Sequence, residues 1–127
     1  MSGDILDLSG TSAVITGASS GIGRECALLL AGLGTSIVVA DIAADAGKNT
    51  EEEIGGRGGR AKFVLTDVTD GAHVERLFSE AATASGSVDA LVHCAGVMST
   101  TPVMEIGMQE WERVMSISLG ATFFCAR

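Results

Sequence analysis

A glycine-rich turn contains the residues of this chain whose types and spacing best suit a chemical task. The turn reads Thr16-Gly17-Ala18-Ser19-Ser20-Gly21-Ile22-Gly23, directly after an apolar run and directly before a helical pattern. Gly17 permits a tight turn, Gly21 lets the backbone approach a diphosphate, and Gly23 allows close packing of helix against strand. Free N–H groups at the helix start would hold the phosphates. We therefore predict that this turn binds a phosphate or a dinucleotide, a purely structural turn being the alternative.

An acidic residue ends the second predicted strand. Asp41, followed by Ile42, lies 18 residues after Gly23. A carboxylate at this place can accept hydrogen bonds from both ribose hydroxyls of an adenosine and repels a 2′-phosphate, so NAD is favoured over NADP. The alternative is that Asp41 caps the next helix. Arg24 is near in the sequence, but its place in the first helical turn predicts a side chain that faces solvent.

The third and fourth predicted strands end in residues that suit the rest of a nucleotide. Asp67 can bond an adenine amino group with Val68 against the ring; helix capping is the alternative, and Asp70 is itself a plausible cap. Cys94-Ala95-Gly96 follows the fourth strand, where small residues let a nucleotide lie close to the backbone. All four strand ends should meet in one crevice, because ligands of open α/β sheets bind where the strand order reverses.

The elements that position these residues follow from the apolar pattern. Short β-branched clusters recur every 24 to 28 residues and predict four strands, at 13–16, 36–40, 61–66 and 89–94. Their runs are nearly continuous rather than alternating, which is typical of strands buried on both faces. The first helical pattern ends at Gly34. Its apolar stripe consists of Ile22, Cys26, Leu29, Leu30 and Leu33.

Three further segments are predicted to be helical. Residues 44–54 form a weak, mostly polar segment, and the pattern from 74 to 82 ends near Gly86. A last helix spans about 108–127 and is still running at Arg127. One side of it carries Trp111, Val114, Met115, Ser118 and Thr122. The alternation predicts an α/β fold: a Rossmann-type, doubly wound parallel sheet in strand order 3-2-1-4, incomplete at the C-terminus.

Length and composition limit the remaining possibilities. The 127 residues suffice for a single domain, 1–127, and 46% of them are apolar, which is ample for a core. Eight basic and sixteen acidic residues give a net charge of −8 without a basic stripe, so nucleic acid and anionic membranes are poor partners. The longest uncharged stretches, 14 and 15 residues, are too short to span a membrane, and a cytoplasmic protein is expected. The three cysteines have no metal-binding or disulfide-framework spacing, so no metal site is predicted.

These motifs resemble the short-chain dehydrogenase/reductase family. Its TGxxxGIG turn is matched in full by residues 16–23, its Asp after the second strand by Asp41, and its Asp-Val by Asp67-Val68. Of its Asn-Asn-Ala-Gly motif only Ala95-Gly96 remains, and residues 111–127 resemble its long fifth helix. The resemblance implies the NAD-binding part of an oxidoreductase that interconverts a small-molecule alcohol and ketone by hydride transfer.

Two departures from the family pattern bear on activity. The fifth-helix Asn of the family, which helps to hold a proton-relay water, aligns with Ser118. Ser118 is the one catalytic candidate here, and its hydroxyl can bond back to the carbonyl one turn earlier and bend the helix. The chain has no Tyr, so the family's catalytic Ser and Tyr-x-x-x-Lys belong beyond Arg127 in a protein roughly twice this length. The resemblance therefore implies that this chain alone is inactive.

A non-catalytic dinucleotide-binding module completed by a partner chain is the alternative function. An uncovered fourth strand would leave backbone groups unpaired, and Trp111, Phe123 and Phe124 make the last helix apolar. A partner or a homo-oligomer is therefore expected. A flavodoxin-like mononucleotide binder is a weaker third hypothesis, because the carboxylate of Asp41 suits a ribose diol.

Overall fold

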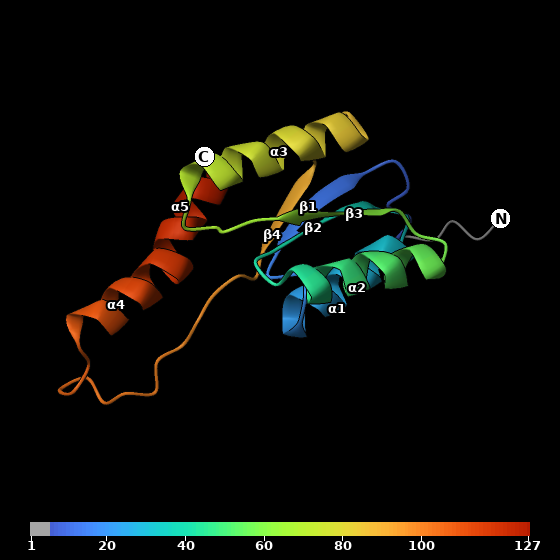
Figure 1. Ribbon diagram of the computed structural model, residues 1–127. Coiled ribbons are helices and arrows are strands. Elements are labelled where there is room, and N and C mark those ends of the chain that lie inside the picture. The colour runs from blue at the N-terminus through green and yellow to red at the C-terminus, as the bar shows by residue number, and fades with distance from the viewer. Residues whose placement is uncertain (1–5) are drawn as a thin grey trace.

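The computed structural model describes residues 6–127, so the first five residues of the predicted domain 1–127 lie outside it. Four parallel strands and the helices that connect them form one sheet-centred unit (Figure 1). The strands are β1 (Ser12–Thr16), β2 (Ser36–Asp41), β3 (Ala61–Leu65) and β4 (Ala90–His93). The helical elements are α1 (Gly21–Gly32), α2 (Ala44–Gly56), α3 (Gly71–Ser85), α4 (Met108–Met115), the π-helical segment η1 (Ser116–Gly120) and α5 (Ala121–Ala126).

The sheet has the order β3-β2-β1-β4, with every pair parallel. Val14 of β1 pairs with Val38 of β2 on one side and with Leu91 of β4 on the other. Helices α1 and α2 cover one face of the sheet, and α3 and α5 cover the other (Figure 1). The predicted α/β class, strand order and double winding are confirmed.

Burial differs between the middle and the edge of the sheet. Every residue of β1 is buried, and so are the four central residues of β2. In β3 only Val64 is buried, and no residue of β4 reaches that level. The prediction of strands buried on both faces is therefore right for β1 and β2 and wrong for β3 and β4. An edge strand has a neighbour on one side only, so its side chains stay partly open to solvent.

The predicted apolar stripe of α1 is wrong in part. Ile22 and Leu29 are 78% and 65% exposed, whereas Gly23, Ala27 and Leu28 are buried. The face with small residues lies against the sheet because it allows the helix to approach more closely. The predicted stop is confirmed within two residues, since α1 ends at Gly32 and Gly34 follows with φ of +99°.

Helix α3 begins and ends as its sequence predicts. Asp70 caps it by accepting hydrogen bonds from the N–H groups of Ala72 (2.9 Å) and His73 (3.4 Å). Gly86 ends it in the left-handed conformation, with φ of +78°. Both ends therefore follow local rules of capping rather than long-range contacts.

The last helix, predicted over about 108–127, is confirmed: α4, η1 and α5 follow one another without a break from Met108 to Ala126. The π-helical segment η1 within it was not predicted. The Ser118 hydroxyl does not bond back one turn but donates to the carbonyl of Val97 (3.3 Å). Of the residues predicted to share one side of this helix, Val114, Met115 and Ser118 are partly buried, whereas Trp111 and Thr122 are exposed. A π-helical turn holds an extra residue, so the faces before and after it no longer follow one spacing.

Candidate nucleotide-binding cleft

The carboxyl ends of the four strands open into one cleft of about 530 Å³. Parallel strands place these ends at the same edge of the sheet, which is why residues far apart in the sequence meet there. All the residues predicted to hold the cofactor line this cleft: Gly17, Ser19, Ser20, Gly21, Ile22, Gly23, Asp41, Ile42, Asp67, Val68, Cys94, Ala95 and Gly96. The structure thus brings them together, and their role in binding remains a prediction.

Two glycines make the turn after β1 possible. Gly17 has φ of +65°, and a Cβ atom there would lie 2.7 Å from the backbone nitrogen of Ala95. A Cβ atom on Gly23 would overlap the carbonyl oxygen of Gly17. Gly17 therefore makes the tight turn that the sequence predicts, whereas Gly23 packs against the turn itself rather than against a strand.

The start of α1 faces the cleft without a side-chain cap. Ser20 precedes the helix with extended backbone (φ −156°, ψ 168°), and no side chain bonds to the first N–H groups. Such groups have no partner inside the helix and carry a partial positive charge. Because Gly21, Ile22 and Gly23 all line the cleft, this end of α1 suits a bound anion such as a diphosphate.

Asp41 is held between the glycine-rich turn and the start of α2. Its Oδ2 atom accepts a hydrogen bond from the N–H of Ser19 (3.1 Å), and its Oδ1 atom accepts one from the N–H of Ala43 (3.0 Å). The residue at the capping position of α2 is Ala43, so Asp41 is not the N-cap considered as the alternative. The carboxylate is half-buried and lines the cleft in a fixed orientation.

Asp67 is ordered by the residue that follows Val68. Its Oδ1 atom accepts hydrogen bonds from the hydroxyl (2.6 Å) and the N–H (2.9 Å) of Thr69. These two bonds lower the pKa of Asp67, so the side chain is a carboxylate at neutral pH. Asp70 is the N-cap of α3, so Asp67 does not cap this helix.

Arg24 does not face solvent as predicted. Its guanidinium pairs with Glu53 of α2 and with Glu25 (2.9 Å), and the side chain is only one-third exposed. Glu53 also pairs with Arg57 (2.6 Å). The Arg24 guanidinium is thus held by Glu53 and Glu25 and is not among the residues that line the cleft. No Lys or Arg is among the described residues that line the cleft.

The candidate catalytic residue lies beside the cleft and not in its lining. Ser118 bonds to Val97, while the neighbouring Ile117 reaches the cleft. Four further lining residues were missed although each is adjacent to a predicted one: Ala40, Ala43, Thr66 and Val97. Strand ends could have indicated those four, whereas for Ile117 the only signal is that it precedes the predicted Ser118.

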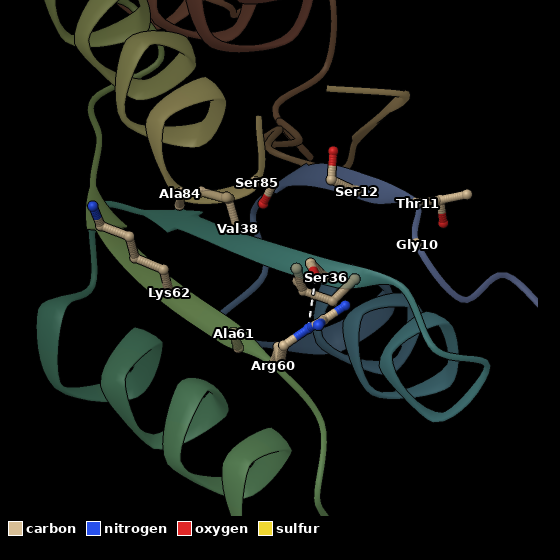
Figure 2. A pocket seen from close by; sticks show the side chains of 11 residues that line it. Gly10, Thr11, Ser12, Ser36, Val38, Arg60, Ala61, Lys62, Ala84 and Ser85 are labelled. Carbon is tan, nitrogen blue, oxygen red and sulfur yellow. Dashed lines mark hydrogen bonds between the residues drawn. The ribbon is translucent and has the colours of Figure 1, made fainter. Parts of the chain in front are cut away.

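A second cavity of about 300 Å³ lies at the opposite end of the strands (Figure 2). Arg60 donates from Nε to the hydroxyl of Ser36 (3.0 Å). The Nζ atom of Lys62 lies 3.5 Å from the Oε2 atom of Glu80. The two cationic groups point apart in Figure 2, so they do not converge on one ligand. The cleft at the carboxyl ends is therefore the better candidate site.

Comparison with known proteins agrees with this geometry. The family model described as short chain dehydrogenase matches residues 11–127. The chain belongs to the short-chain dehydrogenase family. The resemblance inferred from the motifs is thereby confirmed, and with it an oxidoreductase family whose sheet binds nucleotides.

Individual relatives cover nearly all of this chain. An uncharacterized oxidoreductase of Thermotoga maritima is 39% identical over 120 residues, which are 94% of this chain and 47% of that protein. A hydroxysteroid dehydrogenase structure from Escherichia coli superposes with a TM-score of 0.91 at 36% identity, covering 95% of this chain and 51% of the other. A 7α-hydroxysteroid dehydrogenase complexed with NADH and 7-oxo glycochenodeoxycholic acid also gives 0.91 at 36% identity, covering 95% and 47%.

The chain spans about half the length of the curated relatives it matches. No helix within residues 6–127 has the length and apolar character needed to cross a membrane. In the same range, no group of three or more His, Cys, Asp and Glu side chains is arranged to hold a metal ion.

Proposed function

We propose that this chain is the nucleotide-binding part of an NAD-dependent oxidoreductase that interconverts an alcohol and a ketone by hydride transfer. The observation that carries the proposal is the placement of Asp41, a half-buried carboxylate fixed by two backbone N–H groups at the rim of a cleft whose lining, within residues 6–127, contains no Lys or Arg. A carboxylate there accepts hydrogen bonds from a ribose diol, and a 2′-phosphate would be repelled without compensation.

The remaining lining residues fit the other parts of NAD. The uncapped start of α1 at Gly21 suits the diphosphate, and the small residues Ala95 and Gly96 give the dinucleotide room near the backbone. Asp67 and Val68 suit the adenine ring. Bound NAD would supply the hydride acceptor, and the task of this chain is to hold and orient it.

The resemblance to the family assigns proton transfer to a substrate oxygen to a Tyr. This chain has no Tyr, and the Ser118 hydroxyl is engaged with the carbonyl of Val97. We therefore propose that a Ser, Tyr and Lys outside these residues complete the active site, and that this chain alone binds NADH without reducing a ketone.

A non-catalytic module that is completed by a partner chain is the second candidate. It is favoured by the position of β4, which ends the sheet with one side unpaired among the described residues. Reading the source gene past the codon for Arg127 distinguishes the two candidates. A downstream Tyr-x-x-x-Lys supports the oxidoreductase, and an immediate stop codon supports the module.

The cofactor assignment is tested by titrating NAD and NADP into the chain in a calorimeter. We expect NAD to bind at least about tenfold tighter, because the charge of Asp41 opposes the 2′-phosphate. Asp41→Asn retains an acceptor oxygen but removes the charge, so the preference for NAD should shrink about tenfold.

The matched control is Asp45→Asn, a change of the same kind at an exposed residue of α2 that does not line the cleft. It should keep the wild-type preference. Equal affinity of the wild-type chain for NAD and NADP would contradict the proposal.

A further inference from the structure

A buried hydroxyl behind the cleft has three hydrogen-bond partners. The Oγ1 atom of Thr16 lies 3.2 Å from the backbone nitrogens of both Cys94 and Ala95, and 2.7 Å from the Nδ1 atom of His93. Thr16 is fully buried, so water does not compete for these bonds. The hydroxyl therefore connects the end of β1 to the segment Cys94–Ala95 that follows β4, which we call the strap.

The donors and acceptors of this group can be assigned by elimination. Backbone N–H groups only donate: that of Ala95 donates to the Thr16 hydroxyl oxygen, and that of Cys94 is shared between this oxygen and the Thr16 carbonyl oxygen, at 3.2 Å from each, so the two groups occupy the lone pairs of the hydroxyl. The single hydroxyl proton is then left for His93, whose Nδ1 atom must accept it. His93 is therefore a neutral imidazole with its proton on Nε2.

The surroundings of His93 favour the neutral ring. Its Nε2 atom is buried and has no acceptor among the described residues, so the N–H there is unpaired in the neutral and in the charged ring alike. Burial lowers the pKa of His93, and no charged group contributes to that shift. Of the elements packed against β4, β1 has no titratable side chain, α5 offers the thiol of Cys125, and α1 offers the thiol of Cys26 together with the mutually paired Arg24 and Glu25. Helix α3 packs on Leu91 and carries His73, Glu75, Arg76 and Glu80, of which Glu75 and Arg76 are exposed and Glu80 pairs with Lys62.

The strap held by Thr16 is part of the cleft. Cys94 and Ala95 line it, and the Gly17 backbone passes so close that a Cβ there would lie 2.7 Å from the Ala95 nitrogen. A shift of the strap by a few tenths of an ångström would therefore move the glycine-rich turn or open a gap beside it.

We propose that His93 is a positioning residue whose neutral ring accepts the Thr16 proton and thereby keeps the Cys94–Ala95 strap in the geometry that binds the dinucleotide. Protonation would turn Nδ1 into a donor, and the Thr16 hydroxyl oxygen would then release the shared N–H of Cys94 to the Thr16 carbonyl oxygen, which changes how the Cys94–Ala95 strap is held. Dinucleotide affinity should fall as His93 gains its proton. This inference rests on the proposed function.

The first test reads the hydrogen bond without any cofactor. Nitrogen-15 NMR of the His93 imidazole should show the proton on Nε2 and an unprotonated Nδ1 at about pH 7.5. A proton on Nδ1 at that pH would overturn the inference, whatever the chain binds.

The second test measures the affinity for NADH between about pH 8 and about pH 5. The wild-type dissociation constant should rise about fivefold, the effect of one hydrogen bond, as His93 is protonated, and because burial lowers the pKa of His93 the rise should come below the usual pH range of a histidine. His93→Asn offers an amide oxygen to Thr16 and does not titrate, so its profile should be flat. His73→Asn replaces the second of the two histidines in the sequence, whose Nδ1 atom accepts a hydrogen bond from the N–H of Asp67 (3.1 Å). The pH dependence should persist in His73→Asn, and a dependence that disappears there while it persists in His93→Asn would overturn the inference.

The possible outcomes distinguish the positioning role of His93 from the proposed function of NAD binding. NADH binding with the same pH profile in the wild type and in His93→Asn would overturn the inference and leave the proposed function standing. No NADH binding at any pH would contradict the proposed function and the coupling together. The conservative variant decides the question, since more drastic replacements of the half-buried ring can unfold the chain.

Discussion

The shape of the cleft depends on residues that lack a side chain as much as on residues whose side chains are charged. At Gly17 and Gly23 any side chain would collide with backbone, so the turn exists only because these positions have none. At Asp41 and Asp67 the reverse holds, because their carboxylates are oriented by neighbouring N–H and hydroxyl groups. Empty space and fixed charge together shape the cleft.

Replacing Gly23 by Ala should destabilise the fold and weaken dinucleotide binding. The new methyl group would overlap the Gly17 carbonyl oxygen, so the free energy of unfolding should fall by about 1–3 kcal/mol, as in overpacked cores. Gly32→Ala is the control in the same helix, since no atom lies within 4 Å of the added Cβ. It should raise stability by about 0.5–1 kcal/mol. Urea unfolding followed by circular dichroism measures both, and equal effects would contradict the packing argument.

Individual elements begin and end where local chemistry dictates, but their faces are chosen by their neighbours. Asp70 and Gly86 bound α3 by capping and by a left-handed turn. In contrast, the wide apolar surface of α1 offers more than one stripe, and the sheet selects the one with small residues. The π-helical segment η1 likewise places Ser118 against Val97, a contact between segments 21 positions apart.

Removal of the α3 cap should cost stability without touching the cleft lining. Asp70→Ala leaves the N–H groups of Ala72 and His73 without their acceptor, so the free energy of unfolding should fall by about 1 kcal/mol. Asp70→Asn should restore most of it because the amide oxygen can still accept. Glu75→Ala, at an exposed position of the same helix, should change stability by less than about 0.5 kcal/mol. Thermal melts provide the comparison, and a loss of equal size in Glu75→Ala would refute a capping role.

Much of the apolar surface that the molecule leaves exposed lies in one part of the chain. The sheet is packed on both faces, yet seven large apolar side chains between residues 98 and 123 are at least half exposed. They are Met98, Val103, Met104, Met108, Trp111, Leu119 and Phe123. Surface of this kind is typical of association sites, which agrees with the homo-oligomer proposed from the sequence.

We expect the chain to self-associate through this segment. Sedimentation equilibrium should give an average mass that rises with concentration. The double change Leu119→Lys and Phe123→Lys should lower that mass by adding charge to the apolar surface. Leu29→Lys, at a similarly exposed residue of α1, should leave it unchanged. A wild-type chain that stays monomeric at every concentration would rule out the proposed association.

Much of the fold and the positions of the cleft residues could be predicted because their signals are local. Strand–helix alternation indicates a doubly wound parallel sheet, and such a sheet brings the ends of β1, β2, β3 and β4 to one edge. The glycine-rich turn, Asp41 and Asp67 are therefore neighbours by topology alone. Each signal lies within a few residues of the element that it defines.

The tertiary structure alone decided how the helices face the sheet and which distant side chains meet. Periodicity cannot choose among overlapping stripes, so the exposure of Ile22 and Leu29 was not foreseen. The pairing of Arg24 with Glu53 and of Thr16 with His93 joins positions 29 and 77 apart. Such contacts depend on strand register and on how closely each helix packs, and both are set only when all the layers are assembled.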